Sequence, residues 1–333
     1  MTSSFPAFRI HQEQGQIVSR LETITLDDLN AGELVIRVGY STINYKDALA
    51  ATGKGKILRK YPLVGGIDLA GEVVSSADET FAAGDRVVVT GCGLSETHDG
   101  GYAHYARVSA SCAVRIPDSL SERECMAIGT AGFTAALAID RMEQNGQRAD
   151  GGDILVTGAT GGVGSLAIDM LSSRGYSVVA LTSKRASQAY LMALGAQRTL
   201  LREEVVLGTR PLEAGRWAGA IDNLGGELLA WITRTTDVHG NIACVGMAAS
   251  TELSTTVLPL ILRGVNLLGI NSVYVPHDTR VRIWQRLAGD LRPQHLDAIV
   301  TNTIELGQLP AAFDRYIEGA IVGRTVVRIA ASG

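Results

Sequence analysis

The feature that most constrains this chain is an apolar run that leads through a glycine turn into a helical pattern. Residues 154–165 read ILVTGATGGVGS. Bare backbone at Gly161 and Gly162 lets a pyrophosphate approach, Gly164 lets a helix pack closely on the strand, and the helix N-terminus offers free N–H groups. Ala159 occupies the first position of the usual G-x-G-x-x-G pattern. We therefore expect a dinucleotide site, with a purely structural turn as the alternative.

The segment that follows repeats the same rhythm of strand and helix. Helical patterns at Val163–Arg174 and Ala186–Leu194 alternate with short apolar runs. The expected strands are Asp153–Thr157, Ser177–Leu181, Arg198–Leu201, Gly219–Asn223, Gly240–Val245 and Asn266–Ile270. Repeated β–α units predict a parallel sheet. Aromatic residues make up only 5% of the chain, which suits a buried parallel sheet covered by helices. The expected fold class is α/β, with a Rossmann doubly wound domain.

The end of the second expected strand indicates which nicotinamide cofactor would bind. NAD sites usually place an acidic residue there, to hold the ribose 2′-hydroxyl. Residues 178–185 read VVALTSKR and contain no acid. Thr182, Ser183 and Lys184 could instead hold a 2′-phosphate. The sequence therefore favours NADPH, with a solvated basic helix start as the alternative.

The rest of the chain is typical of a second domain. Before residue 116, short β-like runs alternate with glycine and charged residues, which predicts an antiparallel, partly barrel-like domain. Its expected strands are Glu33–Tyr40, Leu69–Val74, Asp85–Thr90 and Tyr102–Val108. Ser121 and Glu124 form a capping-box pattern before a helix that runs through Ala138. Further elements are expected as helices at Asp278–Leu291 and Pro310–Glu318 and strands at Thr301–Leu306 and Arg324–Ile329. We predict domains at 1–127 and 128–273, with 274–333 returning to the first.

Charge and cysteine usage exclude several classes of protein. The net charge is −4 and the sequence pI about 5.9, so neither nucleic acid nor an anionic membrane is an expected partner. The N-terminus resembles no signal peptide, and Arg263 interrupts the most apolar stretch. Four cysteines without metal or redox spacing are expected to be free thiols in a reducing compartment. We expect a cytoplasmic protein.

Several strings together resemble a known family over nearly the whole length. The chain is similar to the medium-chain dehydrogenase/reductase superfamily, quinone-oxidoreductase-like branch, and two strings (TGKGK and RPLE with WAGAID) narrow the resemblance to the NADPH-dependent acrylyl-CoA reductase group. The strings are NYKD at 44–47, TGKGK at 52–56, GID at 66–68, GTAGFTA at 129–135, TGATGGVG at 157–164, RPLE at 210–213, WAGAID at 217–222 and GRT at 323–325. The resemblance implies a GroES-like β domain beside the Rossmann domain.

The resemblance also implies that zinc is absent. Zinc alcohol dehydrogenases of the superfamily carry Cys where this chain has Tyr45, and Gly-His-Glu at residues 66–68, where it has Gly-Ile-Asp. A catalytic zinc needs three protein ligands. Reduction of a conjugated C=C bond needs no metal, because the substrate carbonyl delocalises the charge. The implied reaction is therefore hydride transfer from NADPH to the β-carbon of an enoyl thioester, most simply acrylyl-CoA.

Site residues follow from the same resemblance. Tyr45 stands beside the expected nicotinamide, where its phenol could orient substrate or relay a proton; a wall against the ribose is the alternative. Asn44 and Asp47 are expected to position that loop and the cofactor. The implied cofactor contacts are Tyr45, Thr130, Thr160, Gly161, Gly162, Val163, Gly164, Thr182, Ser183, Lys184, Arg202, Met247, Ile261, Ser272 and Arg324.

Some alternatives stay open. A quinone or 2-alkenal reductase and a non-catalytic NADPH-binding sensor fit the same motifs. The string THDGG at 97–101 departs from the related pattern NHWGG and leaves the substrate preference open. The cations Lys54, Lys56, Arg59 and Lys60 could attract the phosphates of coenzyme A or simply be solvated. An edge strand at Asn266–Ile270, after the apolar Val257–Leu262, predicts a homodimer.

Overall fold

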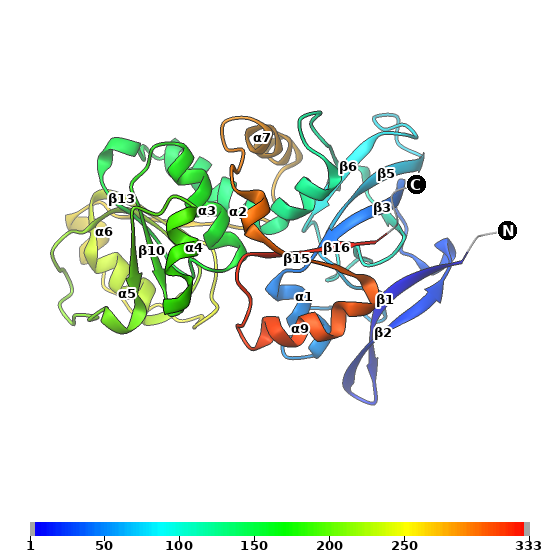
Figure 1. Cartoon of the computed structure of the whole chain (residues 1–333), viewed down its shortest axis with the longest axis horizontal. Coiled ribbons are helices and arrows are strands. Elements are labelled where there is room, and N and C mark those ends of the chain that lie inside the picture. Colours follow the sequence, from blue (N-terminus) through cyan, green and yellow to red (C-terminus); the bar gives the residue numbers. More distant parts are fainter. Residues whose placement is uncertain (1–3, 330–333) are drawn as a thin grey trace. The chain divides into compact units, whose positions relative to one another are not determined.

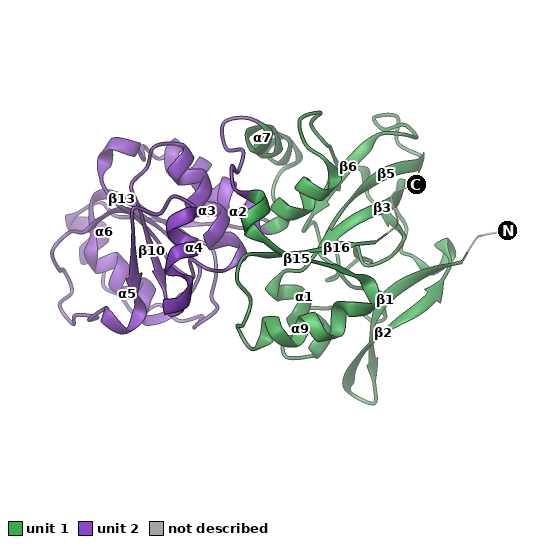
Figure 2. Cartoon of the chain, in the orientation of Figure 1, with its two compact units in different colours: residues 1–130, 273–288, 296–333 green, residues 131–272, 289–295 purple. Residues whose placement is uncertain are grey.

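The chain folds into two compact units. The computed structural model describes residues 4–329. Unit 1 comprises residues 1–130, 273–288 and 296–333, and unit 2 comprises residues 131–272 and 289–295 (Figure 2). The first boundary falls within helix α2 (Glu122–Gln144), one residue after Gly129, whose backbone is not helical.

Unit 1 is built on two sheets (Figure 1). One has the strand order β2-β1-β4, and the other β15-β16-β3-β5-β6-β8 with β7 also paired to β3. The strands are β1 (Phe5–Glu13), β2 (Gln16–Ile24), β3 (Leu34–Thr42), β4 (Leu63–Val64), β5 (Asp68–Ser76), β6 (Arg86–Thr90), β7 (Tyr105–Val108), β8 (Val114–Arg115), β15 (Val300–Glu305) and β16 (Arg324–Arg328). All their pairings are antiparallel except β15 with β16. The expected β domain is therefore present.

Helices and short turns complete unit 1. They are α1 (Tyr45–Thr52), α7 (His277–Ala288), α8 (Leu296–Ile299), α9 (Leu309–Ile317), η1 (Leu26–Asp28), η2 (Ala110–Cys112) and η6 (Leu306–Gln308). Leu34, Ile36 and Val38 of β3 are fully buried in the core of unit 1. They are alternate residues of the strand, and alternate side chains of a strand point to the same face of the sheet. Strand β16 pairs with β3, so a C-terminal strand contributes to the larger sheet of unit 1.

Unit 2 holds one parallel sheet of six strands, in the order β11-β10-β9-β12-β13-β14. Its strands are β9 (Ile154–Val156), β10 (Val178–Thr182), β11 (Arg198–Leu201), β12 (Trp217–Asp222), β13 (Thr236–Cys244) and β14 (Asn266–Gly269). Its helices and turns are α3 (Gly162–Ser173), α4 (Gln188–Ala193), α5 (Gly226–Thr235), α6 (Leu258–Leu262), η3 (Ala149–Gly151), η4 (Arg185–Ser187) and η5 (Arg202–Glu204). This strand order is that of a Rossmann fold, which confirms the expected α/β class.

Most expected elements differ from the observed ones only at their ends. The capping box at Ser121 is confirmed, because the Ser121 N–H donates to the Glu124 carboxylate at 2.8 Å. The expected strand at Tyr102–Val108 begins only at Tyr105. The backbone before Tyr105 pairs elsewhere, because the Tyr102 N–H donates to the Gly65 carbonyl at 2.9 Å and the Tyr102 carbonyl accepts the Phe8 N–H at 2.8 Å.

The expectation of four free cysteines is wrong for two of them. Cys92 and Cys112 form a disulfide, while Cys125 and Cys244 are free. Their spacing of 20 residues does not indicate a pairing. Only the fold of unit 1 brings the two Cα atoms to 5.9 Å, a distance that a disulfide can bridge. Among residues 4–329, no helix is long and apolar enough to cross a membrane.

Candidate functional site

Asn44 is the centre of a buried polar cluster in unit 1. Its side-chain amide donates to Asp68 at 2.8 Å and to Asp47 at 3.3 Å, and its amide oxygen accepts from Arg324 at 3.1 Å. All four side chains are buried, with at most 9% of the residue exposed. Because each amide atom has a charged partner, the orientation of Asn44 is fixed. Asn44 is also the residue before helix α1, so the cluster sets where that helix begins.

Asp47 holds the first turn of α1. Its carboxylate accepts the N–H groups of Asn44 at 2.8 Å and of Ile67 at 2.9 Å. Burial, together with the nearby negative charge of Asp68, raises the pKa of Asp47 to about 7, although the bonds from Asn44 and Ile67 act in the opposite direction. This carboxyl group therefore changes its protonation near neutral pH.

Asp68 joins three separate parts of the chain. It accepts the backbone N–H of Thr130 at 2.8 Å and the Thr130 hydroxyl, besides the amide of Asn44. Burial raises the pKa of Asp68, while these bonds and the charge of Arg324 oppose that rise. Arg324, on β16, also donates to the carbonyl of Ala127 at 3.1 Å and to the hydroxyl of Thr42 at 2.8 Å.

Gly129 is the point where the cluster closes. A Cβ at this position would lie 2.6 Å from Nη2 of Arg324 and 2.8 Å from Oδ2 of Asp68, and its φ is +52°. Only glycine combines this backbone conformation with such close contacts. The kink in α2 at Gly129 therefore leaves room for the buried side chains of Arg324 and Asp68.

Tyr45 stands at the surface of this arrangement. It is the first residue of α1, directly after the fixed Asn44, and 47% of it is exposed. Tyr45 is therefore accessible and extends from backbone that the cluster fixes. The structure brings together Asn44, Asp47, Thr130 and Arg324 from the predicted set, and Tyr45 is their neighbour in the chain.

In unit 2, the glycine turn has the expected form with one change. The left-handed conformation falls at Gly158, with φ +55°, rather than at the next residue, and Ala159 is fully buried. Alanine is therefore tolerated at the first position of the pattern. A Cβ at Gly164 would lie 2.5 Å from the Gly158 carbonyl oxygen, whereas at Gly161 the nearest atom is 3.3 Å away. Helix α3 thus packs directly on the turn at Gly164, and the approach at Gly161 is less close.

The first turn of α3 can donate hydrogen bonds to an anion. Its N-cap is Gly161, which has no side chain to cap the helix. The N–H groups of a first helical turn have no intrahelical acceptor, and they carry the positive end of the helix dipole. A phosphate at this place would satisfy them.

A cavity of about 400 Å³ opens beside this turn. It is lined by Gly158, Thr160, Leu181, Thr182, Ser183, Arg202, Leu224, Gly225, Gly226, Glu227, Leu228, Ala249 and Ser250. The predicted residues Thr160, Thr182, Ser183 and Arg202 therefore share one cavity. No acidic residue ends β10, and Glu227 enters from the start of α5. Hydroxyl groups, a guanidinium and bare glycine backbone fit a phosphorylated dinucleotide.

The other predicted contacts in unit 2 lie outside this lining. Lys184 is half-buried beside Thr182, whose hydroxyl accepts its backbone N–H at 3.0 Å, and burial lowers the pKa of its ammonium group. Met247 and Ile261 are 67% and 71% exposed. Ser272 follows β14. Their contacts with a cofactor stay predictions.

Sequence reasoning missed two residues of the unit 1 cluster. Asp68 was considered only as the replacement for a zinc-site glutamate, and Gly129 only as part of a family string. One available signal was an acidic residue at the start of the apolar run LAGEVV, which a buried strand accommodates only with charged or polar partners. No signal in one sequence shows that residues 44, 68 and 324 meet.

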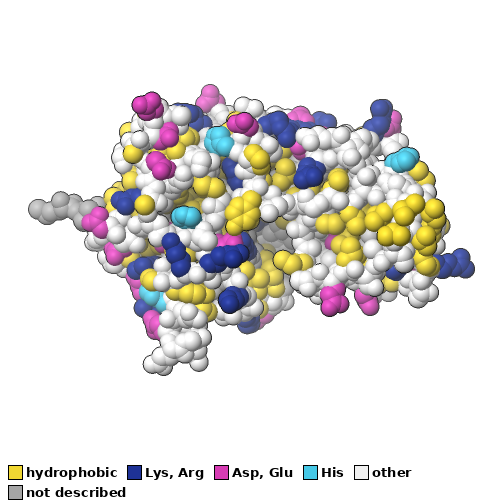
Figure 3. Space-filling view, turned by 180° about the vertical axis from the view of Figure 1, so that it is seen from behind, with side chains coloured by type: hydrophobic (Ala, Val, Ile, Leu, Met, Phe, Trp, Pro, Cys, Tyr) yellow, Lys and Arg dark blue, Asp and Glu magenta, His cyan; other side chains and the backbone are white. Residues whose placement is uncertain are grey.

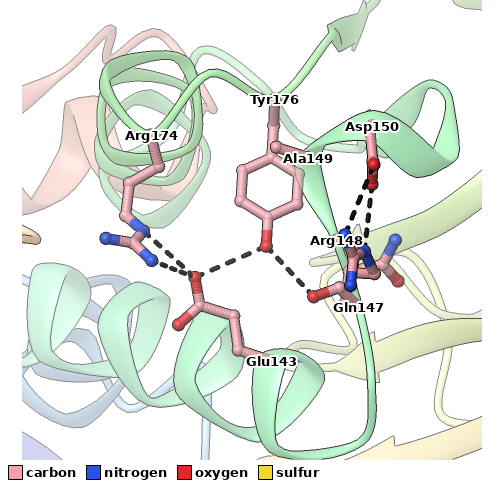
Figure 4. Close-up of a pocket in the computed structure, with 7 residues that line it drawn as sticks. All are labelled: Glu143, Gln147, Arg148, Ala149, Asp150, Arg174 and Tyr176. Carbon is pink, nitrogen blue, oxygen red and sulfur yellow. Dashed lines mark hydrogen bonds and ion pairs between the residues drawn. The ribbon is translucent and has the colours of Figure 1, made fainter.

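A second hollow in unit 2 has its charges paired internally. Arg174 donates to Glu143 at 3.0 Å, Tyr176 reaches the same carboxylate at 3.4 Å, and Arg148 pairs with Asp150 at 3.2 Å (Figure 4). These pairs explain the arrangement without a ligand. Within residues 4–329, no three His, Cys, Asp or Glu side chains are grouped so that they could hold a metal ion.

Comparison with known proteins places the chain in a family. Residues 30–118 match the model of the alcohol dehydrogenase GroES-like domain, and residues 162–288 match that of the zinc-binding dehydrogenase family. The acrylyl-CoA reductase AcuI of Ruegeria pomeroyi is 43% identical over 96% of this chain and 96% of its own. A Bacillus subtilis protein named as a quinone oxidoreductase, YhfP, is 44% identical over 99% of this chain and 100% of its own.

Solved structures agree with these matches. The yhdH oxidoreductase of Salmonella enterica, in complex with NADP, has a TM-score of 0.95 and 42% identity, covering 98% of this chain and 100% of its own. The structure of YhfP, with NAD bound, has a TM-score of 0.96 over the same shares of the two chains. The chain therefore belongs to the medium-chain dehydrogenase/reductase superfamily, in its quinone-oxidoreductase-like branch, and is an oxidoreductase.

Proposed function

We propose that this chain uses NADPH to reduce the C=C bond of an α,β-unsaturated acyl thioester, with acrylyl-CoA as substrate and propionyl-CoA as product. The similarity to a named acrylyl-CoA reductase, at 43% identity over nearly the full length, supports the substrate class. The observation that carries the proposal is that the accessible Tyr45 directly follows Asn44, whose side chain the buried cluster fixes. The cluster thus fixes the backbone from which this O–H donor extends.

The residues around the unit 2 cavity support NADPH as the cofactor. Two related structures at 42% identity carry NADP or NADPH, and a third, at 44% identity, carries NAD. In this chain, Thr182, Ser183 and Arg202 line the cavity, and Lys184 directly follows Ser183. They would hold the 2′-phosphate and the adenosine end, while Gly161 and the start of α3 would hold the pyrophosphate. A bound 2′-phosphate could also form a charge-assisted hydrogen bond with the ammonium group of Lys184.

The chemistry requires one hydride and one proton. Bound NADPH supplies the hydride for the β-carbon of the substrate, and an acid or a water molecule donates a proton to the α-carbon. Negative charge develops on the thioester oxygen between these events and needs hydrogen-bond donors that are already in place. The Tyr45 hydroxyl is one such donor. Asn44 and Asp47 hold it in position through the first turn of α1.

A side-by-side assay tests this function. Loss of NADPH absorbance is followed with acrylyl-CoA, a 2-alkenal and a benzoquinone, and NADH replaces NADPH as the control. We expect the largest kcat/KM for acrylyl-CoA, and only with NADPH. Tyr45→Phe should lower kcat with acrylyl-CoA by about 10- to 100-fold while NADPH still binds.

A second candidate function is the reduction of quinones. It is favoured by the name of the relative with 44% identity. Turnover restricted to benzoquinone would establish this function and overturn the first. Bound NADPH without turnover of any of the three substrates would instead indicate a non-catalytic NADPH-binding protein.

We also infer that two copies of the chain join through β14. This strand is an edge of the unit 2 sheet, and the helix before it exposes Ile261 at 71% and Leu262 at 63%. Figure 3 shows hydrophobic side chains gathered on the unit 2 side of the molecule. Two such edges can pair across a two-fold axis and bury these side chains. Light scattering at micromolar concentration should give twice the chain mass of 35.2 kDa, and a monomer would contradict the inference.

A further inference from the structure

A strongly cationic segment follows helix α1 in unit 1. Residues 53–60 read GKGKILRK and contain four cations and no acid, although the whole chain has a net charge of −4. All four of these side chains are exposed. Figure 3 shows Lys and Arg side chains gathered on one face of unit 1, as expected for such a segment. We refer to residues 53–60 as the cationic segment.

Most of this charge has no counter-charge among residues 4–329. Glu96 is the acidic neighbour, and it pairs with Arg59 at 3.4 Å and with Lys46 at 2.6 Å. One carboxylate is thus divided between two cations. Among the described residues, no carboxylate lies within ion-pair distance of Lys54, Lys56 or Lys60. Neighbouring like charges repel each other, and an anion from outside would relieve that repulsion.

The backbone of the cationic segment is held in place. Leu58 is 3% exposed and packs in the unit 1 core, and the Arg59 N–H donates to the Glu96 carbonyl at 2.8 Å. The segment begins at Gly53, the left-handed C-cap of α1, where a Cβ would lie 2.9 Å from Ile17. The cations are therefore presented from an ordered backbone, which lowers the entropic cost of binding a ligand.

We propose that the cationic segment binds the phosphate groups of the coenzyme A part of the substrate. This inference rests on the proposed function, because only a coenzyme A thioester carries a pyrophosphate and a 3′-phosphate far from its reacting carbon atoms. Tyr45 begins α1 and the cationic segment follows its end, so the eight residues of this helix separate the two by about 12 Å. An extended thioester can reach from one to the other.

Charge pairing of this kind should change substrate binding and leave the chemical step unchanged. The phosphates lie away from the reacting bond, so the contact is equally strong in the ground state and in the transition state. An exposed charge pair contributes a factor of about 1.5 to 5 in affinity. Loss of three cations should therefore raise KM about tenfold at low salt, with kcat unaltered.

The test compares two thioesters that differ only in the phosphate-bearing part. Acryloyl-CoA and acryloyl-pantetheine are assayed with the native chain and with the K54Q/K56Q/K60Q variant. We expect KM for acryloyl-CoA to rise about tenfold in the variant, and KM for acryloyl-pantetheine to stay unchanged. The control is R141Q/R210Q/R216Q, which removes three exposed cations from unit 2. Circular dichroism verifies that both variants are folded.

The outcomes separate this inference from the proposed function. Turnover of both thioesters with the same KM in the native chain and the lysine variant would overturn the inference alone. The inference would also be overturned if the lysine variant raised KM equally for both thioesters, or if the control variant raised KM for acryloyl-CoA as much as the lysine variant does. A chain that turns over neither thioester would remove the proposed function, and this inference would fall with it.

Discussion

The two units hold their polar groups in opposite ways. In unit 1, Asn44, Asp47, Asp68 and Arg324 are buried, and each is hydrogen-bonded to protein. In unit 2, the turn at Gly161 and the cavity beside it offer backbone N–H groups and hydroxyls toward open space. The first arrangement is complete without a ligand and can position a surface residue. The second leaves donors that a ligand would satisfy, and we therefore assign positioning to unit 1 and cofactor binding to unit 2.

The largest effect should come from removing the cation of the buried cluster. Arg324→Met takes away the positive charge beside Asp68 and the donors to Asn44 and Thr42, so unfolding should become easier by about 3–5 kcal/mol. Urea denaturation followed by circular dichroism measures this. Arg328→Met is the matched control on the same strand, because Arg328 is half-exposed and pairs with Glu305 at the surface; it should cost less than about 1 kcal/mol. If both variants lost the same stability, the buried hydrogen bonds of Arg324 would not be the cause.

The pH dependence of stability should distinguish buried from exposed carboxylates. The pKa of Asp47 is about 7 in the folded chain and near 3.8 when unfolded. The folded state therefore binds the extra proton between these values, and this contribution to stability is lost as pH rises from about 4 to about 7. The free energy of unfolding of the native chain should fall by on the order of 3 kcal/mol as the pH rises through this range, and Asp47→Asn should remove that fall.

An exposed carboxylate in the same kind of helix start provides the control. Asp28 accepts the Thr25 N–H at 2.8 Å, as Asp47 accepts that of Asn44, but exposure lets its bonds with Thr25 lower its pKa. Urea midpoints at pH 5 and pH 8 are compared for both variants and the native chain. Asp28→Asn should leave the decline in place, and a decline that survives Asp47→Asn would assign it to another group.

Alanine substitutions at two glycines of the unit 2 turn should separate the effect on packing from the effect on cofactor binding. At Gly164 a Cβ would press on the backbone of Gly158, so Gly164→Ala should cost about 2 kcal/mol of stability and weaken NADPH binding. At Gly161 a Cβ would lie 3.3 Å from the Gly158 carbonyl oxygen, a tight contact that a small shift relieves, so the same change should cost less, on the order of 1 kcal/mol, yet still hinder the pyrophosphate. Urea denaturation and a fluorescence titration with NADPH measure the two quantities. A stable Gly161→Ala variant with native affinity would contradict the placement of the pyrophosphate.

The same contrast explains which parts of the molecule the sequence could predict. Part of the unit 2 site is contiguous, since a strand, a glycine turn and the next strand end fall within residues 154–184, and local patterns therefore predicted the sheet together with Thr182 and Ser183. Thr160 and Arg202 came from the family resemblance, and the lining at residues 224–228 and 249–250 was missed because it comes from later strand ends. The unit 1 cluster joins residues 44, 68, 129 and 324, which only the folded sheet brings together. The pairing of Cys92 with Cys112 was missed for the same reason. Asn44 and Asp47 were found through a family string, and their partner Asp68 was not.

The smallest effect should appear in the choice between the two nicotinamide cofactors. Lys184 follows β10, and burial lowers the pKa of its ammonium group; a 2′-phosphate at this place would form a charge-assisted hydrogen bond with that group. Lys184→Gln should reduce the ratio of kcat/KM for NADPH over NADH by about five- to tenfold, or about 1 kcal/mol, with stability unchanged. Arg185→Gln is the control, because Arg185 is exposed and already pairs with Glu203 and Glu204. If both variants altered the ratio equally, general surface charge would set the preference. If neither did, the hydroxyls of Thr182 and Ser183 with Arg202 would have to provide it alone, since these are the remaining predicted donors at that end of the cavity.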